Sequence, residues 1–118
     1  MPLYTAPFAQ PAAGTSTDGI TAAAGGGYAN AVQLVSRFNH VSTVATTGDS
    51  VRLPPCVPNL ALHVSNDGVN ALSVFPYGNG IDRLNNSAVG ASISVPAGKT
   101  MSLTGTGSPG RWHELVSA

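Results

Sequence analysis

The chain has 118 residues, of which only five are Lys or Arg and five are Asp or Glu, and its formal net charge at pH 7 is zero. A hydrophobic fraction of 42% with so little charge excludes an intrinsically disordered chain, which combines low hydrophobicity with high net charge. The basic residues are scattered singly, which argues against a nucleic-acid-binding protein, because such proteins gather Lys and Arg on one face. No stretch approaches the ~18 apolar residues of a membrane-spanning helix.

A neutral, charge-poor surface lacks the electrostatic repulsion that keeps protein molecules apart. We therefore expect a homo-oligomer or a subunit of a larger assembly. The first residues, Met1 to Phe8, contain neither the basic segment nor the continuous apolar segment of a secretory signal peptide. This predicts synthesis in a cytoplasm.

The first 30 residues differ in composition from the remainder. They contain no Lys or Arg, a single acid at Asp18, and a run of three alanines and three glycines at 22–27. Small residues do not fill a core, so residues 1–30 are predicted to form an extended N-terminal arm. Five bulky apolar side chains nevertheless lie along it, at Leu3, Tyr4, Phe8, Ile20 and Tyr28. One interpretation is a solvated terminus; the other, which we favour, is a partner-binding arm that becomes ordered on a neighbouring subunit.

From residue 31 onwards, short β-like runs alternate with turn sequences, a pattern typical of a β-sandwich or small barrel. The clearest alternation places Leu60, Leu62 and Val64 on one face and His63 on the other. The predicted strands cover residues 31–36, 40–47, 50–53, 60–64, 71–75, 89–95, 100–104 and 111–116. Residues 29–38 also fit helical spacing, so strand and helix both stay open there. The prediction is one all-β domain over 31–118, an antiparallel, jelly-roll-like β-sandwich.

Three segments of this domain carry particular expectations. Asp67-Gly68 suits a type I′ turn, so it predicts a hairpin that joins strand 60–64 to strand 71–75. The alternation at 89–95 predicts a strand with Val89, Ala91, Ile93 and Val95 in the core. Trp112 is expected in the core, with its indole N–H hydrogen-bonded at the rim.

The sequence offers little that points to catalysis. The five acids are dispersed, and Asp49 and Asp67 occupy turns, where an Asp side chain usually caps its own backbone. Neither a nucleophile elbow (Gly-x-Ser-x-Gly) nor a phosphate-binding loop occurs. We therefore expect a protein that is not an enzyme and that uses no cofactor.

The histidines and the single cysteine carry a further question of chemistry. His40, His63 and His113 lie in three predicted strands, without a metal-ligand spacing such as His-x-His. The imidazoles would converge only if these strands shared a sheet, and the spacing favours no metal site. Cys56 is expected to be a buried small hydrophobic residue. Tyr77, at a turn after Phe75, is either a platform for a sugar or part of the packing at a hairpin end, and we favour packing.

Several segments together resemble a known family. They are Thr43 to Pro55 (TVATTGDSVRLPP), Val64 to Pro76 (VSNDGVNALSVFP), the turn Gly80 to Asp82, Ser92 to Lys99 (SISVPAGK) and Gly110 to His113 (GRWH). Over residues 40–116 the chain resembles the small β domain of tailed-bacteriophage virion proteins, namely capsid decoration (cement) proteins and some head-fibre or tail-fibre proteins. These are strand and turn patterns, so no active-site residues carry over, and the arm lies outside the resemblance.

The resemblance implies a mechanical role. The chain would be a structural virion protein that is made in the host cytoplasm, binds the major capsid protein on the outer capsid surface and stabilises the head. It would act as a homo-oligomer, a trimer first and a dimer second, without nucleic-acid or membrane partners. Its arm would add strand-to-strand contacts, which need no charge. The alternative is a head-fibre or tail-fibre module that binds a receptor or glycan.

Overall fold

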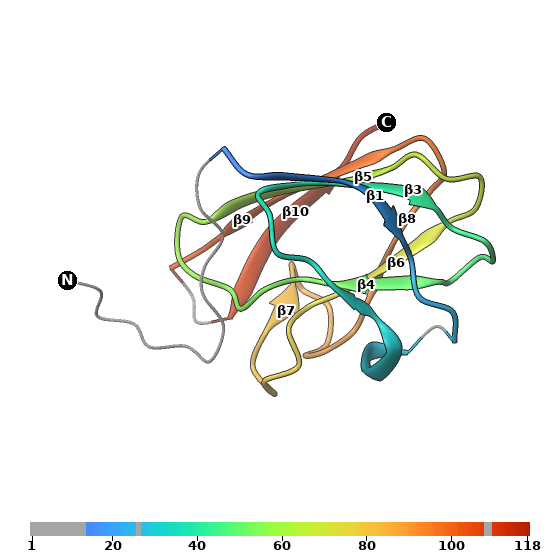
Figure 1. The fold of residues 1–118 in the computed structure, drawn as a ribbon. Coiled ribbons are helices and arrows are strands. Elements are labelled where there is room, and N and C mark those ends of the chain that lie inside the picture. The colour runs from blue at the N-terminus through green and yellow to red at the C-terminus, as the bar shows by residue number, and fades with distance from the viewer. Residues whose placement is uncertain (1–13, 26, 108–109) are drawn as a thin grey trace.

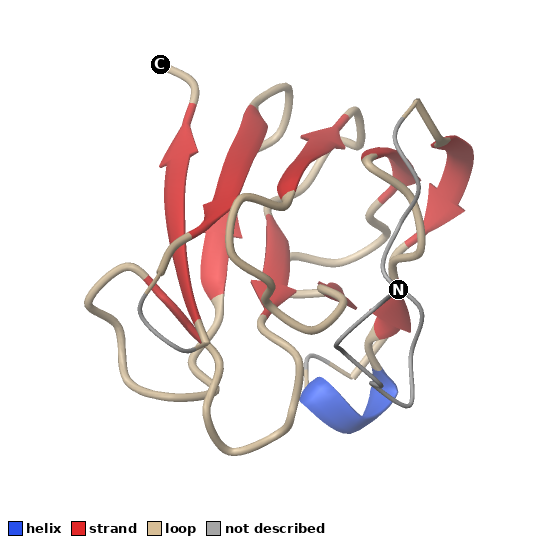
Figure 2. Cartoon of the chain, turned by 90° about the vertical axis from the view of Figure 1, so that its left-hand side faces the viewer, coloured by secondary structure: helices blue, strands red, loops and turns tan. Residues whose placement is uncertain are grey.

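The structure, a computed structural model, describes residues 14–25, 27–107 and 110–118. Within these ranges the strands form two sheets (Figure 1). The larger sheet contains, in spatial order, β1 (Ser16–Thr21), β3 (Phe38–Thr43), β5 (Ala61–Asn66), β9 (Thr100–Gly105), β10 (Arg111–Val116) and β7 (Arg83–Leu84). The smaller sheet contains β2 (Val32–Gln33), β4 (Ser50–Arg52), β6 (Leu72–Phe75) and β8 (Ile93–Val95). The described residues include no α-helix, only a 3-10 turn, η1 (Tyr28–Asn30), drawn in blue in Figure 2. The all-β prediction is confirmed.

The chain changes sheet after nearly every strand. From β1 to β9, each strand lies in the sheet opposite to that of the strand before it, and only β9 and β10 are consecutive in one sheet. Two neighbours in a sheet are therefore usually separated in sequence by a strand of the other sheet, and they run in the same direction. Five of the eight pairings between the described strands are parallel. The prediction of antiparallel sheets is wrong because most connections lead from one sheet to the other and do not reverse within a sheet.

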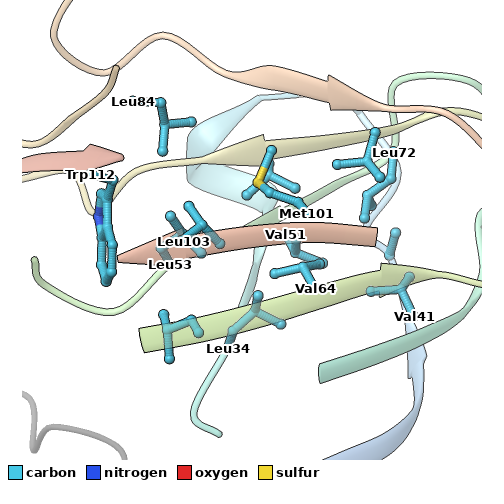
Figure 3. Close-up of a cluster of buried hydrophobic side chains, with 14 of the residues drawn as sticks. Leu34, Val41, Val51, Leu53, Val64, Leu72, Leu84, Met101, Leu103 and Trp112 are labelled. Carbon is cyan, nitrogen blue, oxygen red and sulfur yellow. The ribbon is translucent and has the colours of Figure 1, made fainter. Parts of the chain in front are cut away.

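The core lies between the sheets and contains side chains from both. On β5, Leu62 and Val64 are fully buried, and on β6 Leu72 and Val74 face them from the smaller sheet. The predicted alternation of both strands is thus confirmed. Figure 3 shows Trp112 at one end of the cluster. The cluster comprises Ala22, Leu34, Val41, Val44, Val51, Leu53, Leu60, Leu62, Val64, Leu72, Val74, Leu84, Val95, Met101, Leu103 and Trp112. Each fully buried Leu or Val stabilises the fold by ~1.5–3 kcal/mol relative to an exposed one.

Trp112 differs from expectation in one respect. Its side chain is fully buried as predicted, but its indole nitrogen has no hydrogen-bond partner among the described residues. Burial without a partner costs ~1–3 kcal/mol. The packing of the large ring against the core outweighs this cost.

The turn at Asp67-Gly68 does not close a hairpin, which corrects the prediction for this segment. It is a corner between the two sheets, since β5 and β6 belong to different ones. Asn66 holds the corner: its Nδ2 donates to the carbonyl oxygens of Asn70 and Val95, both at 2.9 Å, and its Oδ1 accepts the Gly68 N–H at 3.0 Å. A Cβ atom on Gly68 would lie 2.9 Å from the backbone nitrogen of Val44. The glycine is therefore needed for close approach of two chain segments.

The predicted arm of residues 1–30 extends too far. The strand β1 pairs with β3 in parallel, Ile20 packs against the core, and Ala22 is buried within it. Ala23 then forms a bridge to Ser50 of the smaller sheet. Residues 16–23 are thus part of the folded domain, because backbone pairing and two small apolar contacts suffice at a sheet edge. Residues 1–13 lie outside the described residues.

Two further segments have secondary structure that their sequences did not predict. The strand predicted for 89–95 is shorter, since β8 begins at Ile93 and the side chain of Val89 is 50% exposed. The open choice at 29–38 resolves into the turn η1 and the short strand β2, followed by the buried Leu34. No continuous helix or long strand forms there.

Candidate functional site

All three histidines lie on one surface, which we call the outer face: the side of the larger sheet that points away from the smaller sheet. Side chains alternate along a strand. Because Asn39 and Val41 are buried, His40 points outward from β3, and the same argument applies to His63 beside Leu62 and Val64 and to His113 beside Trp112. The outward orientation predicted for His63 is confirmed.

Phe38 stacks with two of these histidines. Its ring stacks on the ring of His40 with centroids 4.6 Å apart, and on the ring of His63 with centroids 5.3 Å apart. Both histidines are close because His40 lies two residues further along β3 and His63 is the register partner of Phe38 on β5. The His63 Nδ1 atom is 3.1 Å from the hydroxyl of Ser102 on β9. Phe38, His40 and His63 thus form one contiguous group of stacked rings on the outer face.

His40 also lies between two carboxylates. Its Nε2 atom is 3.6 Å from Asp18 Oδ1, and its Nδ1 atom is 3.4 Å from Asp67 Oδ2. Asp18 reaches this position from a bulge in β1, where Gly19 has a φ of 70°. The carboxylate side chains are 82% and 53% exposed, so each pair contributes ~0–1 kcal/mol. These three side chains therefore matter more for the charge of the outer face than for the stability of the fold.

Two arginines occupy the opposite part of the outer face. Arg83 of β7 and Arg111 of β10 are register partners. Their neighbours Leu84 and Trp112 are fully buried, so both arginines point outward. The guanidinium of Arg111 donates to Asn86 Oδ1 at 2.8 Å. This pair was not predicted from the sequence, where its only signal is that each arginine precedes a core residue in a strand.

The three histidines do not converge on a metal. His40 and His63 each stack on the ring of Phe38, and His113 lies on β10, which β9 separates from β5. Within residues 14–25, 27–107 and 110–118, no group of three His, Cys, Asp or Glu side chains has a geometry that would hold a metal ion.

Cys56 and Asp82 form a second cluster, below the outer face. The buried Asp82 carboxylate accepts the backbone N–H of Cys56 at 2.8 Å and the Asn79 side-chain N–H at 2.9 Å. Burial raises the pKa of Asp82, against the effect of these hydrogen bonds. Burial, and next the Asp82 charge, raise the pKa of the Cys56 thiol to about 12. The thiol is half-buried and stays protonated at neutral pH, which makes it a poor nucleophile.

The predicted partner-binding residues fall into two groups. Leu3, Tyr4 and Phe8 lie outside the described residues. Ile20 packs against the core of its own chain. Tyr28 is used within the domain as well: its ring contacts Phe75 edge to face at 6.3 Å, the Arg52 guanidinium lies 4.9 Å from its centroid, and its hydroxyl accepts the Gly78 N–H at 2.9 Å.

The aromatic segment at the end of β6 and in the following turn packs against other parts of the domain. Pro76 is buried, Tyr77 is half-buried, and Phe75 contacts Tyr28. A Cβ atom on Gly78 would collide with the Tyr28 ring. The packing interpretation of this aromatic segment agrees with these contacts.

Fold and surface together define a two-sheet all-β domain whose larger sheet presents a polar outer face with few charges. No family model, curated protein or solved structure matches the chain. In the part of the chain that the structure describes, no helix has the length and apolar character needed to cross a membrane.

Proposed function

We propose that the chain is a structural virion protein, a capsid decoration (cement) subunit that binds the major capsid protein on the outer capsid surface. The proposal includes a non-catalytic role, assembly into a homo-oligomer, and the finer description of the fold as a sandwich-type domain with an N-terminal arm. It originates in the resemblance of residues 40–116 to such proteins.

The observation that carries the proposal is that polar side chains hydrogen-bond to the backbone of other chain segments and so hold the connections of the domain in place. Asp82 binds the loop at Cys56, Asn66 joins the β5 corner to Val95, and Asn70 donates to the carbonyls of Val44 and Ala45 at 2.8 and 3.1 Å. These hydrogen bonds hold the connections between the sheets in place. They suit a rigid module whose task is to keep its shape under load.

The second support is the pattern of backbone pairing. Four strands of the larger sheet, β1, β3, β5 and β9, pair across chain segments that are distant in sequence. Unfolding such a sheet requires the loss of many non-local contacts. A sheet held together in this way suits a subunit that must persist on a particle.

The third element is the segment before Gly14. The proposal assigns to Leu3, Tyr4 and Phe8 contacts with a neighbouring subunit, which many copies on one particle would make effectively permanent. Ile20 and Tyr28 are left out of this assignment because they pack within their own domain.

The experiment is a binding assay on particles that lack the chain. Purified full-length protein and a variant without residues 2–12 are added, and the bound fraction is measured after sedimentation. We expect saturable binding of the full chain and binding at least tenfold weaker for the truncated one, with equal melting temperatures. Full-length protein that never binds contradicts the capsid role. Equal binding of both proteins contradicts the role of the arm.

A longer deletion serves as the matched control for folding. Removal of residues 2–20 also removes most of β1 and the core contact of Ile20. We expect this variant to melt at a lower temperature, unlike the variant that lacks residues 2–12. A melting temperature equal to that of the full chain would contradict the assignment of β1 to the folded domain.

A further inference from the structure

We propose that the outer face is a self-association surface, on which a second copy of this chain docks through a twofold axis. This inference deepens the homo-oligomer part of the proposed function and rests on it, but it does not require a capsid. It names the surface and the partner: the outer face of an identical molecule.

The first observation is that the charges of the outer face are separated. Asp18 and Asp67 meet around His40 at the β1 and β3 edge. Arg83 and Arg111 lie at the opposite edge, on β7 and β10. One side of the sheet therefore carries two negative charges and the other carries two positive charges.

The two groups also lie at opposite ends of the strands. Asp67 directly follows the end of β5 at Asn66. Gly105 of β9 lies beyond the other end of β5, and it is the register partner of Trp112, next to Arg111. The acidic and basic groups thus occupy diagonally opposite corners of the outer face.

The second observation is the unfavourable position of the arginines themselves. Arg83 and Arg111 are direct register partners, and like charges directly opposite each other destabilise a sheet. The Arg111 guanidinium donates to the side-chain amide of Asn86, which is neutral. A carboxylate from another molecule would relieve this repulsion.

Diagonal corners of opposite charge are what a twofold interface needs. In such an interface the same surface occurs on both sides, so every contact is made twice. An axis that lies in the interface along the other diagonal brings the acidic corner of each copy over the basic corner of its partner. The strands of the two copies then cross at a large angle, as in orthogonal packing of sheets.

The centre of the outer face is compatible with contact between two copies. His63 and Ser102, a register pair at the middle of the sheet, lie close to the axis. Leu115, 69% exposed on β10, adds an apolar side chain in the same row. Because the formal charges lie at the corners, docking leaves the central region with few charges to desolvate.

The first test is a charge-reversal cycle measured by sedimentation equilibrium. We expect the wild-type chain to dimerise, with weaker dimerisation at high salt because salt screens the corner contacts. Asp18→Lys and Arg111→Glu should each raise the dimer Kd at least tenfold, and the double variant should return it to within about threefold of the wild type. Lys99→Glu, which makes the same change of charge as Arg111→Glu in the turn before β9, should leave the Kd unchanged.

Three results would overturn the inference. They are a wild-type chain that stays monomeric at millimolar concentration, single variants with the dimer Kd of the wild type, or a double variant whose dimer Kd is no lower than that of the single variants. Melting curves establish that each variant is folded, and Asp67→Lys with Arg83→Glu gives a second cycle if one fails to fold.

The second test locates the axis by cross-linking. In a Cys56→Ala background, Ser102→Cys should give a covalent dimer with a short bis-maleimide reagent, whereas Ser94→Cys, exposed on β8 of the smaller sheet, should not. Cross-linking of Ser94→Cys but not of Ser102→Cys would contradict the proposal that the outer face is the dimer interface. A monomer that still binds particles contradicts this inference and leaves the capsid role standing; a dimer that never binds particles does the opposite.

Discussion

Asn85 binds Glu114 as a neighbouring strand would. The Asn85 Nδ2 atom donates to the Glu114 carbonyl oxygen at 3.1 Å and to its Oε2 atom at 2.7 Å, and the Asn85 Oδ1 atom accepts the Glu114 N–H at 2.9 Å. The strand β7 contains only two residues, Arg83 and Leu84. One side-chain amide thus extends the pairing of β7 with β10, at a residue whose φ is 50°.

Replacement of Asn85 should separate the hydrogen bonds from the backbone conformation. Asn85→Gly keeps the left-handed conformation and loses the three bonds, so we expect a loss of about 2 kcal/mol of unfolding free energy. Asn85→Ala should cost about 1 kcal/mol more, because an alanine is strained at this φ. Urea unfolding measures both. Equal stability of the two variants would contradict the role of the backbone conformation.

The corner after β5 provides a second comparison, between adjacent residues. Asn66 is fully buried and makes three hydrogen bonds, while Asp67 is exposed. Asn66→Ala should therefore lower the unfolding free energy by about 3 kcal/mol, and Asp67→Ala by less than about 1 kcal/mol. The difference is measured by chemical denaturation. Similar losses would argue that Asp67, as in a hairpin turn, governs this segment.

Two glycines, one at the end of β9 and one in the loop that follows, test how closely chain segments approach. A Cβ atom on Gly105 would collide with the carbonyl oxygen of Val57, whereas one on Gly107 would meet nothing within 4 Å. We expect Gly105→Ala to destabilise the fold by more than about 2 kcal/mol and Gly107→Ala to change stability by less than about 0.5 kcal/mol. Thermal unfolding of the two variants checks this, and a tolerated Gly105→Ala would contradict the contact with Val57.

The raised pKa of Cys56 has a consequence for stability at high pH. The folded state holds the thiol proton more tightly than the unfolded state, since the pKa rises from 9.0 to about 12. The contribution to stability is complete below pH 9 and is lost as the pH rises from 9 towards 12. Cys56→Ala should therefore lose less stability than the wild type over this range, in unfolding experiments at several pH values.

The same residue gives a simpler readout with a thiol reagent. At pH 8 the native thiol should react with Ellman's reagent at least ten times more slowly than the thiol in urea, because the thiolate is the reactive form. Comparable rates in the two states would mean that the thiol is not shielded.

The sequence predicted which residues face the core better than how the strands are connected. The alternation of Leu60, Leu62 and Val64 shows one buried face, because side chains on a strand alternate strictly. Alternation carries no information about the direction of the neighbouring strand. The parallel pairing of β5 with β3 therefore could not be predicted from it.

The residues of a turn likewise do not show which sheet the next strand joins. Asp67-Gly68 suits a tight turn whether the next strand returns to the same sheet or crosses to the other one. The choice is made by Asn66, whose side chain reaches Val95, a contact 29 residues away. Similarly, Asp18 and Gly19 interrupt β1 with residues of low strand propensity, and the pairing with β3 stabilises the strand despite them.

The outer face was only partly visible in the sequence. The positions of Phe38 and His40, two residues apart, predict that they share a face, but the stacking of His63 on Phe38 depends on a register of 25 residues. The proximity of Arg83 and Arg111 depends on a parallel pairing across 28 residues. Long-range register of this kind has no local signal.

The most direct measurement for the proposed structural role is the copy number of the chain in purified virus particles, by quantitative mass spectrometry. The account predicts roughly hundreds of copies per particle, as multivalent coverage of a capsid surface requires. Absence of the chain from the particles, or a copy number of about a dozen as in a fibre or tail component, would contradict it.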